Sequence, residues 1–365
     1  MNLFSIISIC TFALAQFTFA QLSNFDEWEH ERIQLDDVSI HFRYHGEGAP
    51  ILLVHGFPQH SLTWHTIGPI LAQNSDTVIA PDIRGCGDSA LLFSKNYTAA
   101  AAGTDLKAIL DYLNITSTYV FAHDKGVGLA TSLAIEHPSV VEAIILAEYA
   151  LPGYGYPTQV TSSSLYQNWQ FAFFAVPDAA EFFIQGREKQ MLSWYFFHAS
   201  YSGTAALSED HLQRYTNEIS KPGFLRSGME YFAAAWDDEA YFTSVFGSGK
   251  RLQMPLLVLG GEASFSPVTL LEEIWSQISD DFVAEAIPKA GHWIGEKLLF
   301  MVYQDPIWVL FASRARTDQL TLELGDENPI WTGKRALQFF GRAGQISSIN
   351  LSYLKDRVTL QGGIV

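Results

Sequence analysis

The feature that most constrains the fold of this chain is an alternation of short, continuously apolar runs with longer segments of helical periodicity. Continuous apolar runs are typical of strands buried on both faces of a parallel sheet, and the helical segments between them cover those faces. The expected strands are 51–54, 77–80, 118–122 and 143–147, the expected helices are 63–72, 98–113 and 126–137, and a hairpin is expected at 33–44. Such a sheet collects its chemistry at the carboxyl ends of its strands.

The alternation is interrupted once. From 152 to 249 it gives way to aromatic-rich helical segments, and it returns with expected strands at 256–260 and 282–287. We therefore predict an α/β fold with a mostly parallel sheet flanked by helices. Its core comprises residues 21–151 and 250–345, and a helical cap is inserted at 152–249.

The first residues of the chain have the composition of a targeting segment. Residues 1–20 are apolar and uncharged, and the small residues Thr18 and Ala20 occupy the −3 and −1 positions of a cleavage site before Gln21. This pattern predicts a secretory signal peptide, although the usual basic n-region is missing and an uncleaved N-terminal anchor is the alternative. We expect a secreted protein or one of the secretory pathway.

Cysteines and sequons bear on the same expectation. Cleavage removes Cys10 and leaves Cys86 as the single cysteine, so no intramolecular disulfide is expected. Asn-X-Ser/Thr sequons predict glycosylation at Asn96, Asn114 and Asn350.

The charge of the chain restricts its partners. The formal net charge is −17, from 39 acidic and 22 basic residues, which argues against nucleic acid or an anionic membrane surface as a partner. No stable membrane insertion is expected after cleavage, because the apolar stretch 298–311 is interrupted by Asp305 and Pro306. The sequence has no metal-ligand cluster, phosphate loop or dinucleotide fingerprint, so we expect a small-molecule substrate, no cofactor and no metal.

The strongest local signal for chemistry lies at residues 120–128, Val-Phe-Ala-His-Asp-Lys-Gly-Val-Gly, where an expected strand enters a helix through a tight turn. This is the geometry of a nucleophile elbow, with Asp124 at its apex. A carboxylate is ionised at neutral pH and can displace a leaving group from saturated carbon without an activating base. The product is an alkyl ester that must then be hydrolysed. His292, after the last expected strand, is the natural base.

Four motifs occur in order along the chain: His55-Gly-Phe-Pro58, Asp82-Ile-Arg-Gly-Cys-Gly-Asp-Ser89, His123-Asp-Lys-Gly126 and Gly291-His292-Trp293. Over residues 30–295 this combination resembles the epoxide hydrolase and haloacid or haloalkane dehalogenase branch of the α/β-hydrolases. The resemblance implies an α/β-hydrolase fold, an oxyanion hole made by the backbone N–H groups of Phe57 and Lys125, and a cis Pro58.

The acid that orients His292 has two candidate positions in this branch. The usual position follows the next-to-last catalytic strand, where this chain has Ser264. In other members the acid follows the strand after the nucleophile helix, and in this chain that position is occupied by Glu148. The resemblance therefore implies Glu148 as the acid, with Glu262 as the alternative.

The cap residues bear on the substrate. Epoxide hydrolases usually activate the ring oxygen with two cap tyrosines; Tyr231 matches the second, and Gln170 occupies the place of the first. Trp169, Gln170 and Phe171 are therefore expected to contact substrate, although cap packing is an equally good explanation for Gln170 and Tyr231. Gln170 can donate a hydrogen bond but cannot protonate an alkoxide.

The dehalogenases differ at several of these positions. Fluoroacetate dehalogenases place His and Trp where this chain has Gln170 and Phe171, and two arginines where it has Lys125 and Gly128. Haloalkane dehalogenases carry Trp where it has Lys125. These departures make a dehalogenase the second hypothesis.

Beyond Gly295 the chain departs from the family. The resemblance resumes at residues 327–340, so residues 296–326 are interpreted as an atypical insertion, either a retained intron in the gene sequence or a disordered loop. A transcript that retains the insert across Gly295 would reject the intron.

The sequence thus predicts a hydrolase that acts through an ester on Asp124, with an epoxide as substrate and a diol as product. A haloacid or haloalkane dehalogenase is the alternative with the same nucleophile. The altered cap motivates a third hypothesis, a ligand-binding α/β-hydrolase-like protein without catalysis, for which Asp124→Ala would leave ligand affinity unchanged.

Overall fold

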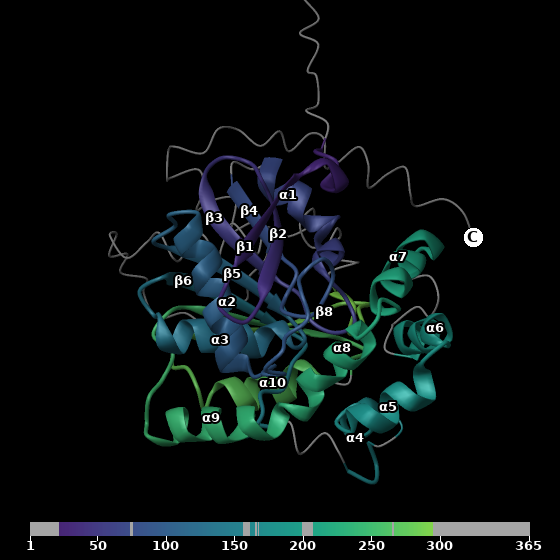
Figure 1. The fold of residues 1–365 in the computed structure, drawn as a ribbon. Coiled ribbons are helices and arrows are strands. Elements are labelled where there is room, and N and C mark those ends of the chain that lie inside the picture. The colour runs from purple at the N-terminus through teal and green to yellow at the C-terminus, as the bar shows by residue number, and fades with distance from the viewer. Residues whose placement is uncertain are drawn as a thin grey trace, which may run out of the picture.

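The computed structural model describes residues 22–294, with gaps at 74–75, 156–160, 165, 167, 199–206 and 265. The predicted signal peptide, Asn350 and the insertion at 296–326 lie outside the described residues. The sheet has eight strands in the order β1-β2-β4-β3-β5-β6-β7-β8 (Figure 1). They are β1 (Glu29–Gln34), β2 (Ser39–His45), β3 (Ala49–Val54), β4 (Asp76–Pro81), β5 (Thr118–His123), β6 (Val141–Ala147), β7 (Leu256–Gly261) and β8 (Phe282–Ile287).

Strand β2 pairs antiparallel with β1 and β4, and all other neighbouring strands are parallel. This confirms the predicted fold class. The reason is visible in β3, where Leu52 and Val54 pack in one hydrophobic cluster while Ile51 and Leu53 pack in the other. Because successive side chains point to opposite faces, a continuously apolar strand buries both faces and requires cover on each.

Helices α1 (Ile67–Gln73), α2 (Ala99–Tyr112), α3 (Gly126–Glu136) and α10 (Val268–Trp275) supply that cover. Helix α1 packs on β4, α10 packs on β7, and α2 and α3 lie side by side across the sheet (Figure 1). The expected single helix at 63–72 is wrong, because a short 3₁₀ helix (Ser61–Trp64) precedes α1. Pro69 accounts for the break, since in a continuous helix it would have no N–H to donate to the carbonyl of His65, whereas in the first turn of α1 no such bond is needed.

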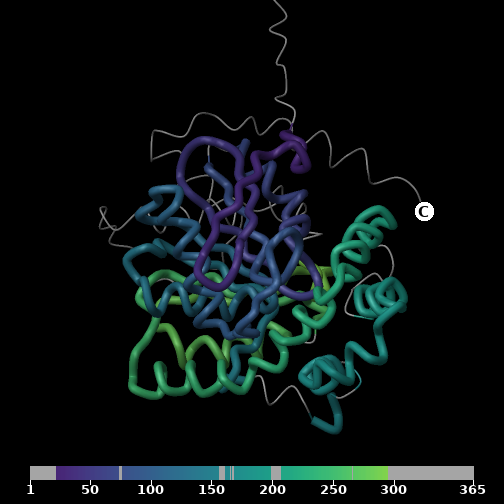
Figure 2. The backbone as a smooth tube through the Cα atoms, viewed as in Figure 1, coloured from purple at the N-terminus to yellow at the C-terminus, as the bar shows by residue number. Residues whose placement is uncertain are grey.

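Between β6 and β7 the described chain is helical. The helices are α4 (Trp169–Phe173), α5 (Pro177–Ile184), α6 (Glu188–His198), α7 (Glu209–Ile219), α8 (Phe224–Ala233) and α9 (Ala235–Gly247). In Figure 2 the teal and green tube of α4 to α7 lies to one side of the strands. The domain boundaries drawn from the sequence stay a prediction. No helix in the described ranges is both long enough and apolar enough to cross a membrane.

Candidate active site

Asp124 occupies the turn between β5 and α3. Its φ is +50°, in the left-handed region that residues other than glycine rarely adopt. The turn is tight because α3 begins against the end of β3: a Cβ on Gly126 would lie 2.6 Å from the carbonyl oxygen of Val54. The strand–turn–helix geometry therefore holds the Asp124 side chain at the carboxyl edge of the sheet.

The two oxygens of the Asp124 carboxylate have different partners. Oδ1 accepts a hydrogen bond of 2.8 Å from the backbone N–H of Phe57, and Oδ2 lies 3.4 Å from Nε2 of His292. Burial raises the pKa of Asp124, but the hydrogen bond and charge of His292, with the charge of Lys125, lower it to about 2. The carboxylate is therefore ionised at neutral pH although it is only 6% exposed.

His292 follows β8 and is fully buried. Its Nδ1 lies 3.1 Å from Oε2 of Glu148, while Nε2 faces Asp124. Burial lowers the pKa of His292, but hydrogen bonds and charges from these two carboxylates outweigh it and raise the pKa to about 9. In the free protein the ring is thus a cation between two anions.

Glu148 follows β6 with a φ of +63°, and its side chain is completely buried. Its carboxylate accepts hydrogen bonds from the backbone N–H of Gly261 and from the hydroxyl of Ser264, in addition to His292. Burial raises the pKa of Glu148, and these donors oppose that rise. Glu262, the alternative acid, is exposed and accepts a hydrogen bond of 2.8 Å from the backbone N–H of Lys289 instead.

Sequence reasoning missed a second histidine of the site. His123 Nε2 lies 2.8 Å from the carbonyl oxygen of His292, and since a carbonyl only accepts, Nε2 carries the hydrogen. Burial lowers the pKa of His123 to about 3, so the ring is neutral. His123 therefore links the loop of His292 to the end of β5, next to the nucleophile. Its position directly before Asp124 was the available signal.

Of the two predicted oxyanion residues, Phe57 contacts the carboxylate through its N–H and Lys125 directly follows Asp124 in the chain. The Phe57 N–H already contacts Asp124, and the Phe57–Pro58 peptide bond is cis, as the resemblance implied. The Lys125 side chain is buried, with Nζ 3.4 Å from the Tyr149 hydroxyl and 4.1 Å above the ring of Phe232. Burial lowers the pKa of Lys125 to about 8.

Tyr231 is in α8, and its hydroxyl hydrogen is directed to a backbone carbonyl. It donates a hydrogen bond of 2.9 Å to the carbonyl oxygen of Arg84, and its ring packs on Tyr97. The next residue, Phe232, packs edge-on against Phe57 at 5.3 Å instead. The catalytic role of Tyr231 stays a prediction, and it requires the hydroxyl to leave Arg84.

The three expected substrate contacts in α4 are placed differently. Gln170 is 1% exposed, and its Oε1 has no hydrogen-bond partner in the described ranges of the chain. An unpaired buried amide oxygen is costly, but as an acceptor it leaves the expected donor role of Gln170 a prediction. Phe171 packs toward Phe232, and the Trp169 ring lies against Phe174 and Trp194.

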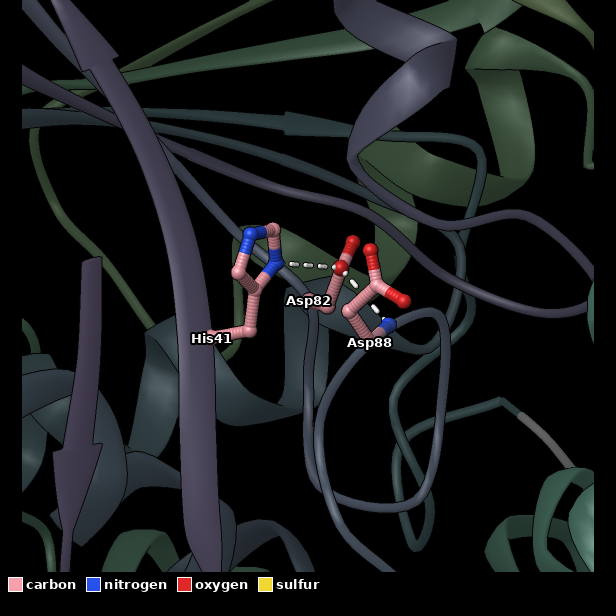
Figure 3. Close-up of side chains that lie close together, drawn as sticks. All are labelled: His41, Asp82 and Asp88. Carbon is pink, nitrogen blue, oxygen red and sulfur yellow. Dashed lines mark hydrogen bonds and ion pairs between the residues drawn. The ribbon is translucent and has the colours of Figure 1, made fainter. Parts of the chain in front are cut away.

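A polar cluster beside β2 has the residue types of a metal site. Ligand atoms of His41, Asp82 and Asp88 lie within 4.8 Å of one another (Figure 3). However, the Asp82 carboxylate accepts from His41 Nδ1 at 2.8 Å, from Ser61 N at 2.8 Å and from Asp88 N at 3.0 Å. Burial raises the pKa of Asp82, but the hydrogen bond from His41 and the charges of the neighbouring histidines outweigh it and hold the pKa well below its usual range.

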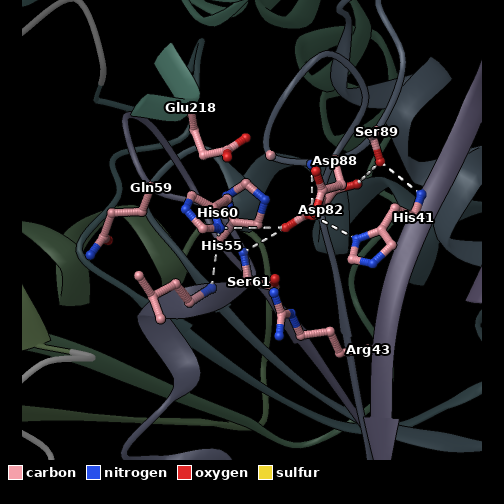
Figure 4. A network of polar contacts seen from close by, with 12 residues as sticks. His41, Arg43, His55, Gln59, His60, Ser61, Asp82, Asp88, Ser89 and Glu218 are labelled. Carbon is pink, nitrogen blue, oxygen red and sulfur yellow. Dashed lines mark hydrogen bonds and ion pairs between the residues drawn. The ribbon is translucent and has the colours of Figure 1, made fainter. Parts of the chain in front are cut away.

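Figure 4 shows that the same carboxylate lies at the centre of a wider network that includes His55, His60 and Ser89. His55 Nε2 accepts a hydrogen bond of 3.0 Å from Ile83 N, which fixes the loop after β4 beside the loop of Phe57. The arrangement fits a structural role for Asp82 in organising these two loops better than an ion site.

Comparison with known proteins agrees with this geometry. Residues 49–297 match the family model described as the alpha/beta hydrolase fold. The chain is 25% identical to a soluble epoxide hydrolase of Corynebacterium sp. (strain C12) over 277 residues, 74% of this chain and 93% of that protein. It is 26% identical to a fluoroacetate dehalogenase of Burkholderia sp. over 281 residues, 75% of this chain and 90% of that protein.

Solved structures give the same result. Cfl2 from Burkholderia cenocepacia superposes with a TM-score of 0.69 at 27% identity, over 76% of this chain and 94% of that one. The epoxide hydrolase CorEH superposes with a TM-score of 0.72 over 79% of this chain and 99% of that one; at 23% identity this likeness supports the fold alone. The protein is therefore a member of the α/β-hydrolase fold family, and within it resembles the epoxide hydrolase and dehalogenase branch.

Proposed function

We propose that the protein opens an epoxide to a diol through a covalent ester on Asp124. One observation carries the proposal: an ionised carboxylate at the strand–helix turn contacts both a backbone N–H donor, Phe57, and the His292–Glu148 pair. The similarity to proteins named epoxide hydrolase supports the choice of substrate.

In the first step Asp124 attacks a ring carbon. Oδ2 is the nucleophilic oxygen, because Oδ1 is held by Phe57 N–H and becomes the carbonyl oxygen of the ester. The new carbon–oxygen bond forms as the ring carbon–oxygen bond breaks, and the ring oxygen leaves as an alkoxide that takes up a proton. We assign that proton to Tyr231, with a further hydrogen bond from the amide of Gln170.

In the second step water hydrolyses the ester. Alkylation removes the charge of Asp124, which is one of the two anions that raise the pKa of His292. The imidazolium then loses its proton, which restores the Tyr231 hydroxyl, and Nε2 accepts a proton from water as the water oxygen attacks the ester carbonyl carbon. The backbone N–H groups of Phe57 and Lys125 hold the oxyanion. Its collapse breaks the bond to the alkyl oxygen, which takes a proton from His292 and leaves as the diol. The carboxylic acid that remains on Asp124 ionises and returns its proton to His292.

The surroundings of the nucleophile favour an apolar substrate. Phe57 lies in a cluster of buried rings with centroid distances of 5.1 to 6.0 Å, formed with Phe174, Tyr195 and Phe232. Apolar walls with a few polar groups are typical of sites for small organic ligands.

The test is intact-protein mass spectrometry of His292→Gln after incubation with aryl and alkyl epoxides and, separately, with halogenated acids and alkanes. Loss of the base should leave the ester unhydrolysed. We expect a mass increase equal to the whole epoxide, located at Asp124 by peptide mapping. The double variant Asp124→Ala, His292→Gln is the control and should gain no mass.

The other outcomes separate the alternatives. A mass increase smaller than the halogenated substrate by one hydrogen halide would indicate a dehalogenase, which the similarity to fluoroacetate dehalogenase motivates. No adduct with any substrate, together with unchanged ligand affinity in Asp124→Ala, would support the ligand-binding protein without catalysis.

We also propose that the protein enters the secretory pathway and is glycosylated. Asn96 and Asn114 are both exposed, as glycosylation requires. Expression in a eukaryotic secretory host should yield protein whose mass falls on treatment with an N-glycosidase. Absence of any fall, in protein recovered from the medium, would contradict the glycosylation.

A further inference from the structure

Ser264 stands where many relatives of this branch carry the acid, yet it has a direct connection to the acid that this chain uses. Its hydroxyl contacts Oε2 of Glu148, the same oxygen that lies 3.1 Å from His292 Nδ1. The two residues are 116 positions apart in the chain and come from the ends of neighbouring strands.

The direction of the Ser264 hydrogen bond is fixed by its other contact. The backbone N–H of Ser266 donates to Ser264 Oγ at 3.0 Å, so the oxygen is the acceptor there. A carboxylate only accepts, so the hydroxyl hydrogen is directed to Glu148. With the Gly261 N–H on Oε1, the buried carboxylate accepts from Gly261, Ser264 and His292.

The charge of Glu148 matters in the second step. Once Asp124 is esterified, His292 acts as a base only if its ring hydrogen is on Nδ1 and Nε2 is unprotonated. An ionised Glu148 accepts from Nδ1 and stabilises that tautomer. A protonated Glu148 would instead donate to Nδ1, placing the ring hydrogen on Nε2, and the base would be lost.

We propose that Ser264 is a positioning residue that keeps Glu148 ionised as the acceptor of the His292 Nδ1 hydrogen, and thereby lowers the pH at which the coupled His292–Glu148 pair takes up a proton and ester hydrolysis is lost. Its effect is confined to the second step, because Asp124 attacks without a base. This inference rests on the proposed function, and the two can be tested apart.

The first test compares Ser264→Ala with Ser264→Thr, which keeps the hydroxyl, in single-turnover reactions followed by mass spectrometry across pH. In Ser264→Ala we expect alkylation within about twofold of wild type. The acid limb of ester hydrolysis, the pH below which its rate falls, should rise by about one pH unit, because one hydrogen bond to the Glu148 carboxylate is lost. Ser264→Thr should keep the wild-type limb. An unmoved limb in Ser264→Ala, or equal slowing of both steps, would overturn the inference.

The second test needs no substrate. The ¹⁵N resonances of the His292 ring, titrated by NMR in the free protein, should report the protonation of Glu148 as a step at acidic pH. We expect the step at higher pH in Ser264→Ala, unchanged in Ser264→Thr and absent in Glu148→Gln. A moved step without any ester on Asp124 would reject the proposed function alone. An ester without a moved step would reject the role of Ser264.

Discussion

At the scale of single residues, the site depends on a change of charge at Asp124. The free carboxylate is one of two anions that hold the His292 pKa at about 9, and the ester is neutral. The same ring is therefore a cation before the first step and a base in the second. A serine nucleophile would need the base at once, whereas a carboxylate needs it only for hydrolysis.

This charge arrangement predicts a pH dependence of stability. The pKa of His292 is raised from 6.5 to about 9, so its stabilisation is fully present below 6.5 and is lost as pH rises through 9. The loss should be on the order of 3 kcal/mol in the free energy of unfolding, measured by urea denaturation at each pH. Asp124→Ala removes one anion, so its decline should be shallower. Equal declines in the two proteins would contradict the assignment.

At the scale of elements, a glycine of α8 lies against Phe57 in the loop beside the nucleophile. A Cβ on Gly228 would lie 2.6 Å from Cε2 of Phe57, the residue whose N–H contacts Asp124. Since that ring is packed against Phe174 and Phe232, it has little freedom to move aside. The position of α8 and the geometry of the oxyanion loop are therefore coupled.

We predict that Gly228→Ala destabilises the protein by about 1–3 kcal/mol and slows alkylation at least tenfold, because the helix or the loop must shift. Gly247→Ala is the matched control: it lies at the end of α9 with nothing within 4 Å of the added Cβ, so stability should hold or rise. Thermal denaturation and single-turnover kinetics provide both measurements. A Gly228→Ala protein with wild-type alkylation would show that α8 and the loop move independently.

At the scale of the whole molecule, local patterns predicted the sheet, and the elbow at Asp124 could be read from one strand–helix junction. Contacts between distant segments could not. The Ser264–Glu148 hydrogen bond joins two strand ends that only the sheet order brings together. The direction of the Tyr231 hydroxyl depends on the rotation of α8, which side-chain identity alone does not fix. The roles assigned to the site residues stay predictions until variants are measured.

The net charge of −17 gives a last prediction, which separates the two substrate classes. Long-range repulsion should slow the association of an anionic haloacid, and salt should relieve it, so kcat/KM for haloacids should rise between about 10 and 300 mM salt. A neutral epoxide should show little dependence. The buried cation Lys125 beside Asp124 opposes this repulsion locally. If kcat/KM for the anion fell with salt instead, local positive charge at the site would outweigh the net charge of the protein. That outcome would favour the dehalogenase hypothesis over the epoxide hydrolase.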